Sequence, residues 1–404
     1  MKLWGLLLLL VSACQAQVFT QRGFVEMRGF FFPQTAPNDS GRAVGEAVLD
    51  YEASWKVTPS FRLTGEVEAQ TDTHQQTERT LHLSWTDRDL RRTMFALRRL
   101  SASYAKGLFL VEAGKQVIRW GKADTLNPTD HFAPRDFLNV VRSEFLGVTA
   151  VRLTYGNQSN SLEAVAAPIF TPSRMPLLNQ RWGGLPVDVA IVNQPTVYPG
   201  GTQLGGRWNH IGSSAEFSLS YFQGFNTLPL INGSLQLSPL PSLAVQRFYP
   251  RIRSYGADMA VPLPAVTFKA EAAYYDARTN AADRYLLWVA QLERQSGEWS
   301  FVGGYSGQVV TRATPTPSFD PDRGLTRAFL GRAGYTIDAN RSFSMQAAIR
   351  QNGRGVWAKT EYTEAFRQHW RLTAGIAVIH GSTGDFFYPY RHNSYASLAL
   401  RYSF

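Results

Sequence analysis

The feature that most constrains the fold is a period-two alternation of apolar and polar residues, repeated in segments of about ten residues. In the segment 47–57, apolar side chains fill every odd position, whereas Asp50 and Glu52 lie on the even face. Residues 61–70 repeat the pattern after a short turn. Alternation of this kind predicts β-strands with two different faces. A charged face does not suit the dry core of a β-sandwich, but it suits a water-filled barrel lumen.

Counting this pattern along the chain predicts an all-β, transmembrane antiparallel β-barrel of about eighteen strands, with sixteen as the alternative. An even number of strands places both termini on the periplasmic side, as in single-chain bacterial barrels. The predicted strands lie near residues 20–33, 43–57, 61–72, 93–105, 108–118, 145–155, 161–170, 201–210, 214–224, 248–262, 265–277, 284–294, 298–309, 324–336, 342–351, 355–364, 369–379 and 392–404.

The connections between these segments are alternately short and long. Long extracellular loops are expected near 73–92, 119–144, 171–200 and 225–247. One strand is irregular, because Arg98 and Arg99 cannot both face the lumen in a regular strand. We therefore expect a β-bulge or a shortened membrane section there.

The two ends of the chain indicate export to an outer membrane. Lys2 and an apolar stretch with five consecutive leucines predict a signal peptide at 1–16, which leaves 17–404 as one barrel. Cleavage after Ala16 competes with acylation at Cys14, since the residues before Cys14 resemble a lipobox. At the other end, Leu398, Leu400, Tyr402 and Phe404 share one face. This ending resembles the assembly signal of Gram-negative outer-membrane barrels.

Composition excludes several classes of protein and site. The chain has 404 residues, a net charge of +10 and a single cysteine, so a disulfide scaffold and a cysteine zinc site are excluded. The seven histidines are scattered, and no nucleophile-elbow or phosphate-loop motif occurs. We expect neither an enzyme nor a metal or cofactor site. Export makes nucleic acid an unsuitable partner for the positive charge.

The clearest family motif begins at Gly114-Lys115-Gln116, continues at Trp120-Gly121 and ends at Asn127-Pro128-Thr129-Asp130. It resembles a group of poorly characterised Gram-negative outer-membrane porin-like barrels with a Gly-Lys/Arg-Gln…Trp-Gly…Asn-Pro-x-Asp signature. A second stretch, from Pro168 to Trp182, is also similar to that group. The resemblance covers the segment from 100 to 182. It implies passive passage across the outer membrane rather than catalysis.

The loop 119–144 carries four basic and four acidic residues. Such a balance is typical of a loop that folds into the lumen, is held by its own ion pairs, narrows the pore and sets a transverse field. The alternative is a packed loop that only caps the barrel. A calcium site made from Asp124, Asp130 and Asp136 is a weaker possibility, since their spacing of six lacks the alternate-residue oxygen pattern of a calcium loop.

The alternation also predicts which charges face the lumen. The bases are Arg152, Arg207, Lys269, Arg332, Arg371 and Arg401, and the acids are Glu46, Asp50, Glu52, Glu66, Glu68 and Glu271. One wall is thus expected to be acidic and most of the rest basic. The candidates for pore lining or constriction are Arg119, Lys122, Asp124, Asp130, Arg135, Asp136, Arg142, Arg152, Arg207, Arg332 and Arg371.

The sequence therefore predicts a porin or facilitated-diffusion channel of the cell outer membrane for small solutes, anions among them. The alternative is a non-conducting barrel, plugged by its loops, with a role in assembly or adhesion. The expected partners are outer-membrane lipid, lipopolysaccharide and small solutes, with a homotrimer possible. The loop 226–244 is unusually apolar, and a plug, a partner surface or an apolar solute path all fit it.

Overall fold

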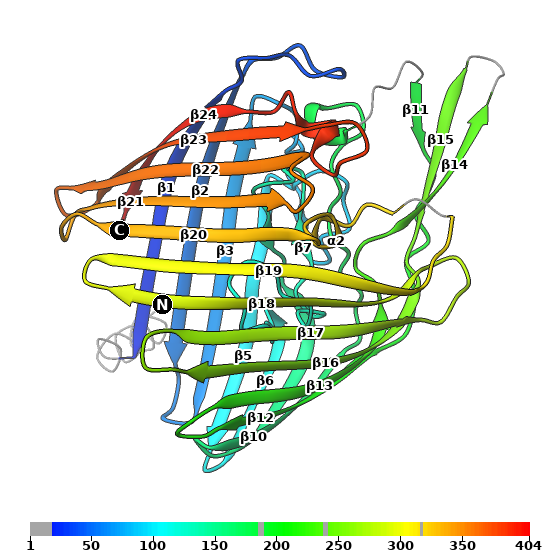
Figure 1. Ribbon diagram of the computed structural model, residues 1–404. Helices are drawn as coiled ribbons and strands as arrows, with labels where there is room; N and C mark the ends of the chain where they lie inside the picture. The colour runs from blue at the N-terminus through cyan, green and yellow to red at the C-terminus, as the bar shows by residue number, and fades with distance from the viewer. Residues whose placement is uncertain (1–17, 185–189, 237–240, 316–317) are drawn as a thin grey trace, which may run out of the picture.

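The computed structural model describes residues 18–184, 190–236, 241–315 and 318–404, which form a closed antiparallel β-barrel of eighteen strands (Figure 1). Each strand pairs with its neighbours in sequence, and β1 pairs with β24 to close the sheet. The barrel strands are β1 (Phe19–Phe31), β2 (Ala43–Lys56), β3 (Phe61–Asp72), β5 (Phe95–Lys106), β6 (Phe109–Gln116), β9 (Val148–Gly156), β10 (Asn160–Ala167), β12 (Gln203–Ile211), β13 (Glu216–Phe225), β16 (Arg251–Pro262), β17 (Thr267–Ala277), β18 (Arg284–Ser296), β19 (Trp299–Arg312), β20 (Ala328–Thr336), β21 (Arg341–Arg350), β22 (Gly355–Phe366), β23 (Trp370–Gly381) and β24 (Tyr395–Ser403). The prediction of eighteen strands is confirmed, and the alternative of sixteen is wrong.

The other elements lie in the long connections. They are the short strands β4 (Leu83–Ser84), β7 (Arg135–Asp136), β8 (Glu144–Phe145), β11 (Ala190–Asn193), β14 (Leu230–Gln236) and β15 (Ser242–Phe248), the helix α2 (Pro321–Gly324) and the 3₁₀ turns η1 (Arg181–Gly183) and η2 (Tyr388–Tyr390). Within the described residues, no helix has the length and apolarity to cross a membrane.

Short turns gather at one end of the barrel and long loops at the other, and the C-terminus and the first described residues lie at the short-turn end (Figure 1). That the short-turn end faces the periplasm remains a prediction. The proposed signal peptide and its cleavage position lie outside the described residues.

The strand that holds Arg98 and Arg99 is irregular, as predicted. In the pairing of β3 with β5, Glu66 lies opposite Arg99 and Val67 lies opposite Leu97, so Arg98 is an extra residue without a partner in the ladder. This bulge lets both arginines reach acids inside the barrel: Arg98 Nη2 lies 3.6 Å from Oε2 of Glu144, in the connection between β6 and β9, and Arg99 Nη2 lies 2.8 Å from Oε1 of Glu112 of β6.

The two faces of the sheet differ in the way that the alternation predicts. In β24, Leu398 is 54% exposed on the outside, whereas Arg401 pairs with Glu26 on the inside. Strand register carries this inner face around the whole barrel, because directly opposed residues share a face. An apolar exterior and a charged interior are what a β-barrel in a lipid bilayer requires.

Candidate functional site

The segment 117–147, which connects β6 to β9 and is called the inward loop below, crosses the lumen and lies against the far wall. Its main contact is Glu271, in the middle of β17. One carboxylate oxygen of Glu271 accepts hydrogen bonds from the backbone N–H of Lys122 at 3.0 Å and of Ala123 at 3.1 Å. The other accepts from the N–H and the hydroxyl of Thr129, at 2.9 and 2.8 Å. The loop therefore enters the lumen rather than capping the barrel.

Ion pairs join the inward loop to the same wall. Asp124 lies 3.2 Å from Lys269 and accepts a hydrogen bond from Gln291 of β18. Lys122 lies 3.3 Å from Glu216 and 3.4 Å from Asp258. The expectation that the loop is held by its own ion pairs is only partly right, because its acids and bases mostly pair with the wall.

Residues of the proposed family motif shape the inward loop locally. Gly114 lies in β6, two residues before the strand ends; its φ is +123°, and a Cβ there would lie 2.2 Å from the carbonyl oxygen of Leu100, so only glycine fits at this position beside β5. Asp130 then accepts hydrogen bonds from the N–H groups of Trp120 and Gly121, at 2.6 and 2.7 Å. Arg119 pairs with the same carboxylate at 3.1 Å, which is an ion pair within the loop of the kind that the charge balance predicted.

Aromatic packing completes the attachment of the loop to this wall. The rings of Trp120 and Phe132 lie edge to face at 5.3 Å, and Phe132 packs on Phe222 of β13. His131 stacks on Phe222 at 4.8 Å and meets the edge of Tyr275. Burial lowers the pKa of His131 to about 4, and its Nε2 has no hydrogen-bond partner in the described part of the chain. His131 is therefore held neutral near pH 7.

The part of the wall formed by strands β9 to β18 is called the anchoring half below. Each charged side chain on its inner face has an ion-pair or hydrogen-bond partner. Arg152 lies 2.9 Å from Glu163, and Arg207 lies 3.0 Å from Asp258. Sequence alternation could place these arginines on the inner face but could not reveal the acids that neutralise them. The expected basic wall is therefore corrected to a wall of paired charges.

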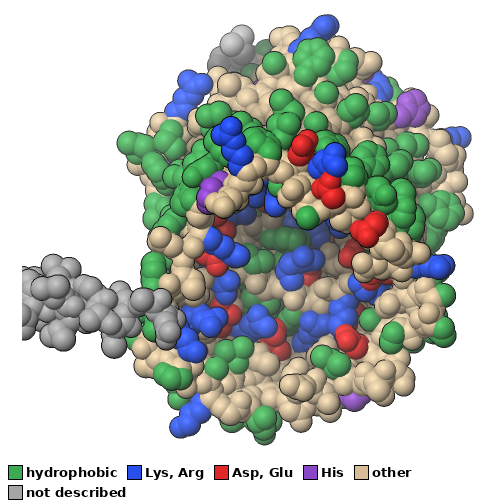
Figure 2. Space-filling model, turned by 90° about the vertical axis from the view of Figure 1, so that its left-hand side faces the viewer, with side chains coloured by type: hydrophobic (Ala, Val, Ile, Leu, Met, Phe, Trp, Pro, Cys, Tyr) green, Lys and Arg blue, Asp and Glu red, His purple; other side chains and the backbone are tan. Residues whose placement is uncertain are grey.

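A second part of the wall, β20 to β24 with β1 to β3, is called the open half because the larger cavities lie there; β5, β6 and β19 separate it from the anchoring half. Three cavities, of about 430, 310 and 260 Å³, adjoin one another, and Arg142 lines all three. Those on the anchoring side measure about 60 and 30 Å³. Figure 2 shows the short-turn end, where charged side chains surround a hollow that leads into the barrel.

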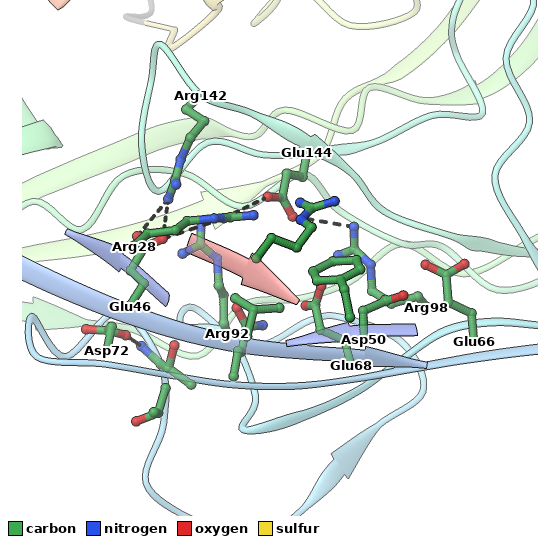
Figure 3. Close-up of a pocket in the computed structure, with 16 residues that line it drawn as sticks. Arg28, Glu46, Asp50, Glu66, Glu68, Asp72, Arg92, Arg98, Arg142 and Glu144 are labelled. Carbon is green, nitrogen blue, oxygen red and sulfur yellow. Dashed lines mark hydrogen bonds and ion pairs between the residues drawn. The ribbon is translucent and has the colours of Figure 1, made fainter. Parts of the chain in front are cut away.

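Arg142 links the inward loop to the open half. Its Nη2 lies 2.7 Å from both carboxylate oxygens of Glu46 (Figure 3). Its guanidinium also lies over the ring of Phe30, 4.7 Å from the ring centre. Arg332 lines the largest cavity, and Arg371 lies on the same inner face. Neither of these two arginines forms an ion pair with any residue that the structure describes.

A buried chain of five charges, called the charge chain below, was missed at the sequence level apart from Asp136. Its successive members are Lys115, Asp87, Arg174, Asp136 and Arg92, joined by contacts of 2.6, 2.9, 3.0 and 3.0 Å. It joins three long connections beneath the loop end of the barrel. Burial alone would raise the pKa of Asp136, but Arg92 and Arg174 lower it well below the usual carboxyl range. A lysine directly after the motif glycine was the available signal, but its partners are 28 or more positions away in sequence.

The remaining candidates lie apart from one another. Arg135 pairs with Asp322, at 3.3 Å, and covers one face of Phe145. The three acids considered for calcium belong to three different ion pairs. Across the described residues, no group of three or more His, Cys, Asp or Glu side chains is arranged to hold a metal ion.

The apolar connection 226–244 mostly leaves the barrel. Its strands β14 and β15 join β11 in a three-stranded sheet that projects beyond the loop end (Figure 1). This projecting sheet does not plug the lumen, so that interpretation is wrong for the part of the segment that the structure describes.

No protein-family model matches the sequence, and no curated protein does. Among solved structures, a BenF-like porin from Pseudomonas fluorescens Pf-5 is similar with a TM-score of 0.56 and 10% identity, over 96% of this chain and 98% of that chain. OccAB4 of Acinetobacter baumannii gives 0.52 and 9%, over 96% and 99%. OpdK of Pseudomonas aeruginosa, solved with vanillate, gives 0.51 and 10%, over 95% and 98%. The chain thus has the fold of Gram-negative outer-membrane porins.

Proposed function

We propose that this protein is a passive, non-enzymatic channel of the cell outer membrane that admits small solutes, including anions. The observation that carries the proposal is the asymmetric position of the inward loop. The loop is fastened to the anchoring half and leaves three adjoining, charge-lined cavities along the open half. A loop that narrows a barrel without filling it restricts passage by size and charge.

The preference for anions rests on Arg332 and Arg371. Both lie on the inner face of the open half and have no acid to neutralise them among the described residues. Fixed positive charge in a narrow lumen raises the local concentration of anions. Because acids also border these cavities, the preference should be modest.

Conductance of the refolded protein in planar bilayers tests the channel. We expect discrete current steps in KCl, and a reversal potential in a KCl gradient that reports a weak anion preference. Raising the salt toward 1 M should remove the preference, because the Debye length falls to about 3 Å. Absence of current would favour the alternative of a plugged barrel with an assembly or adhesion role.

The surroundings of the channel belong to the same proposal. We propose that outer-membrane lipid contacts the apolar exterior and that lipopolysaccharide contacts the loop end. A homotrimer is a further possibility that native mass spectrometry in detergent would test, with a single protomer mass as the contradicting result.

A further inference from the structure

One cavity of the open half is bordered by carboxylates that have no ion-pair partner. This cavity, of about 260 Å³ and called the β2–β3 cavity below, is lined by Asp50 of β2 and by Glu66 and Glu68 of β3 (Figure 3). Within the described chain, none of the three has a cation within ion-pair distance. The charges that remain free around this cavity are therefore negative.

The arginines that share the cavity are already engaged elsewhere. Arg142 contacts Glu46 with both carboxylate oxygens at 2.7 Å. Arg98 lies 3.6 Å from Glu144 and donates to the carbonyl oxygen of Phe145 at 3.0 Å. The remaining lining arginines pair in the same way: Arg28 with Glu26, Arg401 with Glu26 and Arg92 with Asp136.

Strand register brings the free acids together at a cost. Asp50 lies directly opposite Glu68, and Glu52 lies directly opposite Glu66. Like charges at opposed positions on one face destabilise a sheet. Arg22 neutralises Glu52 in an ion pair of 2.5 Å. Asp50, Glu66 and Glu68 have no such ion-pair partner in the described structure.

Glu68 gives independent evidence that this cavity is a binding site. The residue is only 9% exposed, lines the cavity and makes no hydrogen bond to any described residue. A buried carboxylate without a partner is unfavourable unless a ligand or water satisfies it.

We propose that the β2–β3 cavity binds the cationic group, an ammonium or guanidinium, of a small organic solute. This inference rests on the proposed channel function and names a solute chemistry for it. A bound cation would relieve the repulsion between Asp50 and Glu68. No described group of three acids is arranged to hold a metal ion, whereas a planar guanidinium can bridge carboxylates that lie farther apart.

The test uses methylguanidinium as the probe and methylurea, which has a similar shape without the charge, as the comparison. We expect methylguanidinium to reduce the KCl current of the channel and methylurea to have no effect. In Asp50→Asn/Glu68→Gln, the half-blocking concentration should rise about tenfold, since two carboxylate contacts to the cation are lost. The matched control Glu112→Gln/Glu163→Gln removes two inner-face carboxylates away from the cavity and should block like the original protein.

Binding is also read without current, by saturation-transfer NMR of the probe methyl group with the barrel in detergent micelles. If the barrel does not conduct but the double variant loses the NMR signal, the channel function fails and the cation site stands. If the barrel conducts and the variant binds methylguanidinium as tightly as the original, the cation site is refuted. An equal loss in both double variants would also refute it, because the effect would then be general electrostatics. The single variant Glu66→Gln repeats the comparison if the double variant does not fold.

Discussion

The two halves of the barrel wall use charged residues in opposite ways. In the anchoring half, each inner charge has a partner, as in Arg207 with Asp258, and Glu271 holds backbone N–H groups of the inward loop. In the open half, some charges have partners, but Asp50, Glu68 and Arg332 are left facing cavities. The anchoring half therefore uses its charges to hold the loop, whereas the open half holds it through Glu46 and also leaves charges available to solutes.

This difference shows that the net charge of the chain does not indicate which charges a solute meets in the lumen. The chain carries +10 overall, yet the anchoring half is lined by neutral pairs and the β2–β3 cavity by free acids. Selectivity should follow the free charges rather than the pairs, because paired charges produce weak fields at a distance. Arg332 in the largest cavity favours anions, and the free acids of the β2–β3 cavity reduce that preference. The following predictions test this separation, beginning with the largest effect.

Charges that are buried in ion pairs are called locked below, and charges without an ion-pair partner are called free. Removing a locked charge should lower the free energy of unfolding far more than removing a free one. Asp136→Ala leaves Arg92 and Arg174 buried without their shared acid, which should lower the free energy of unfolding by about 3–5 kcal/mol. Glu68→Ala removes a free acid opposite Asp50 and should change the free energy of unfolding by less than about 1 kcal/mol. Urea unfolding of both refolded variants measures the difference, and equal losses would abolish the distinction between locked and free charges.

Removing the main anchor should release the inward loop. Glu271→Ala leaves three backbone N–H groups and one hydroxyl without their acceptor. We therefore expect the free energy of unfolding to fall by about 3 kcal/mol and the conductance to become larger and noisier. Glu361→Ala, in the open half, removes an acid that pairs with Lys359 and does not hold the loop. An unchanged conductance in Glu271→Ala would show that the loop does not limit the pore.

Acid should loosen the anchoring half before the open half. The folded pKa of His131 is about 4, below its ordinary 6.5, so its neutral form contributes stability that is complete above pH 6.5 and is lost as pH falls toward 4. Stability should therefore decline over this range, and His131→Phe should flatten the decline. Protonation of Asp136 would also reduce stability, in the original protein and in His131→Phe alike. That loss would occur at lower pH, since the pKa of Asp136 lies below that of His131. A decline that persists unchanged in His131→Phe would contradict the assignment.

The smallest effect concerns selectivity. Arg332→Gln/Arg371→Gln removes two free cations of the open half and should move the reversal potential toward the cation side. Arg152→Gln/Arg207→Gln removes two paired arginines of the anchoring half and should move it less, since the inward loop lies between that wall and the cavities. A larger shift from the second pair would show that solutes pass along the anchoring half.

Much of the fold was predictable from local pattern. The final strand shows why, since the alternation of Leu398 and Leu400 with Arg401 specifies both a strand and its two faces. The bulge at Arg98 was predictable for the same reason, because consecutive charges break the period of two. These features depend on neighbours in sequence and on the contrast between lipid and water, which a single chain displays directly.

The site depended on contacts that local pattern does not encode. Alternation placed Glu271 on the inner face but could not show that it binds the loop at Lys122, 149 positions away. Nor could it show that Arg152 and Arg207 are neutralised, or that Lys115 and Asp136 belong to one buried chain. The sequence by itself determined the barrel, its strand count and its inner face. Only the tertiary structure decided which inner charges are locked and which are free, because ion pairing depends on distances between segments far apart in the chain.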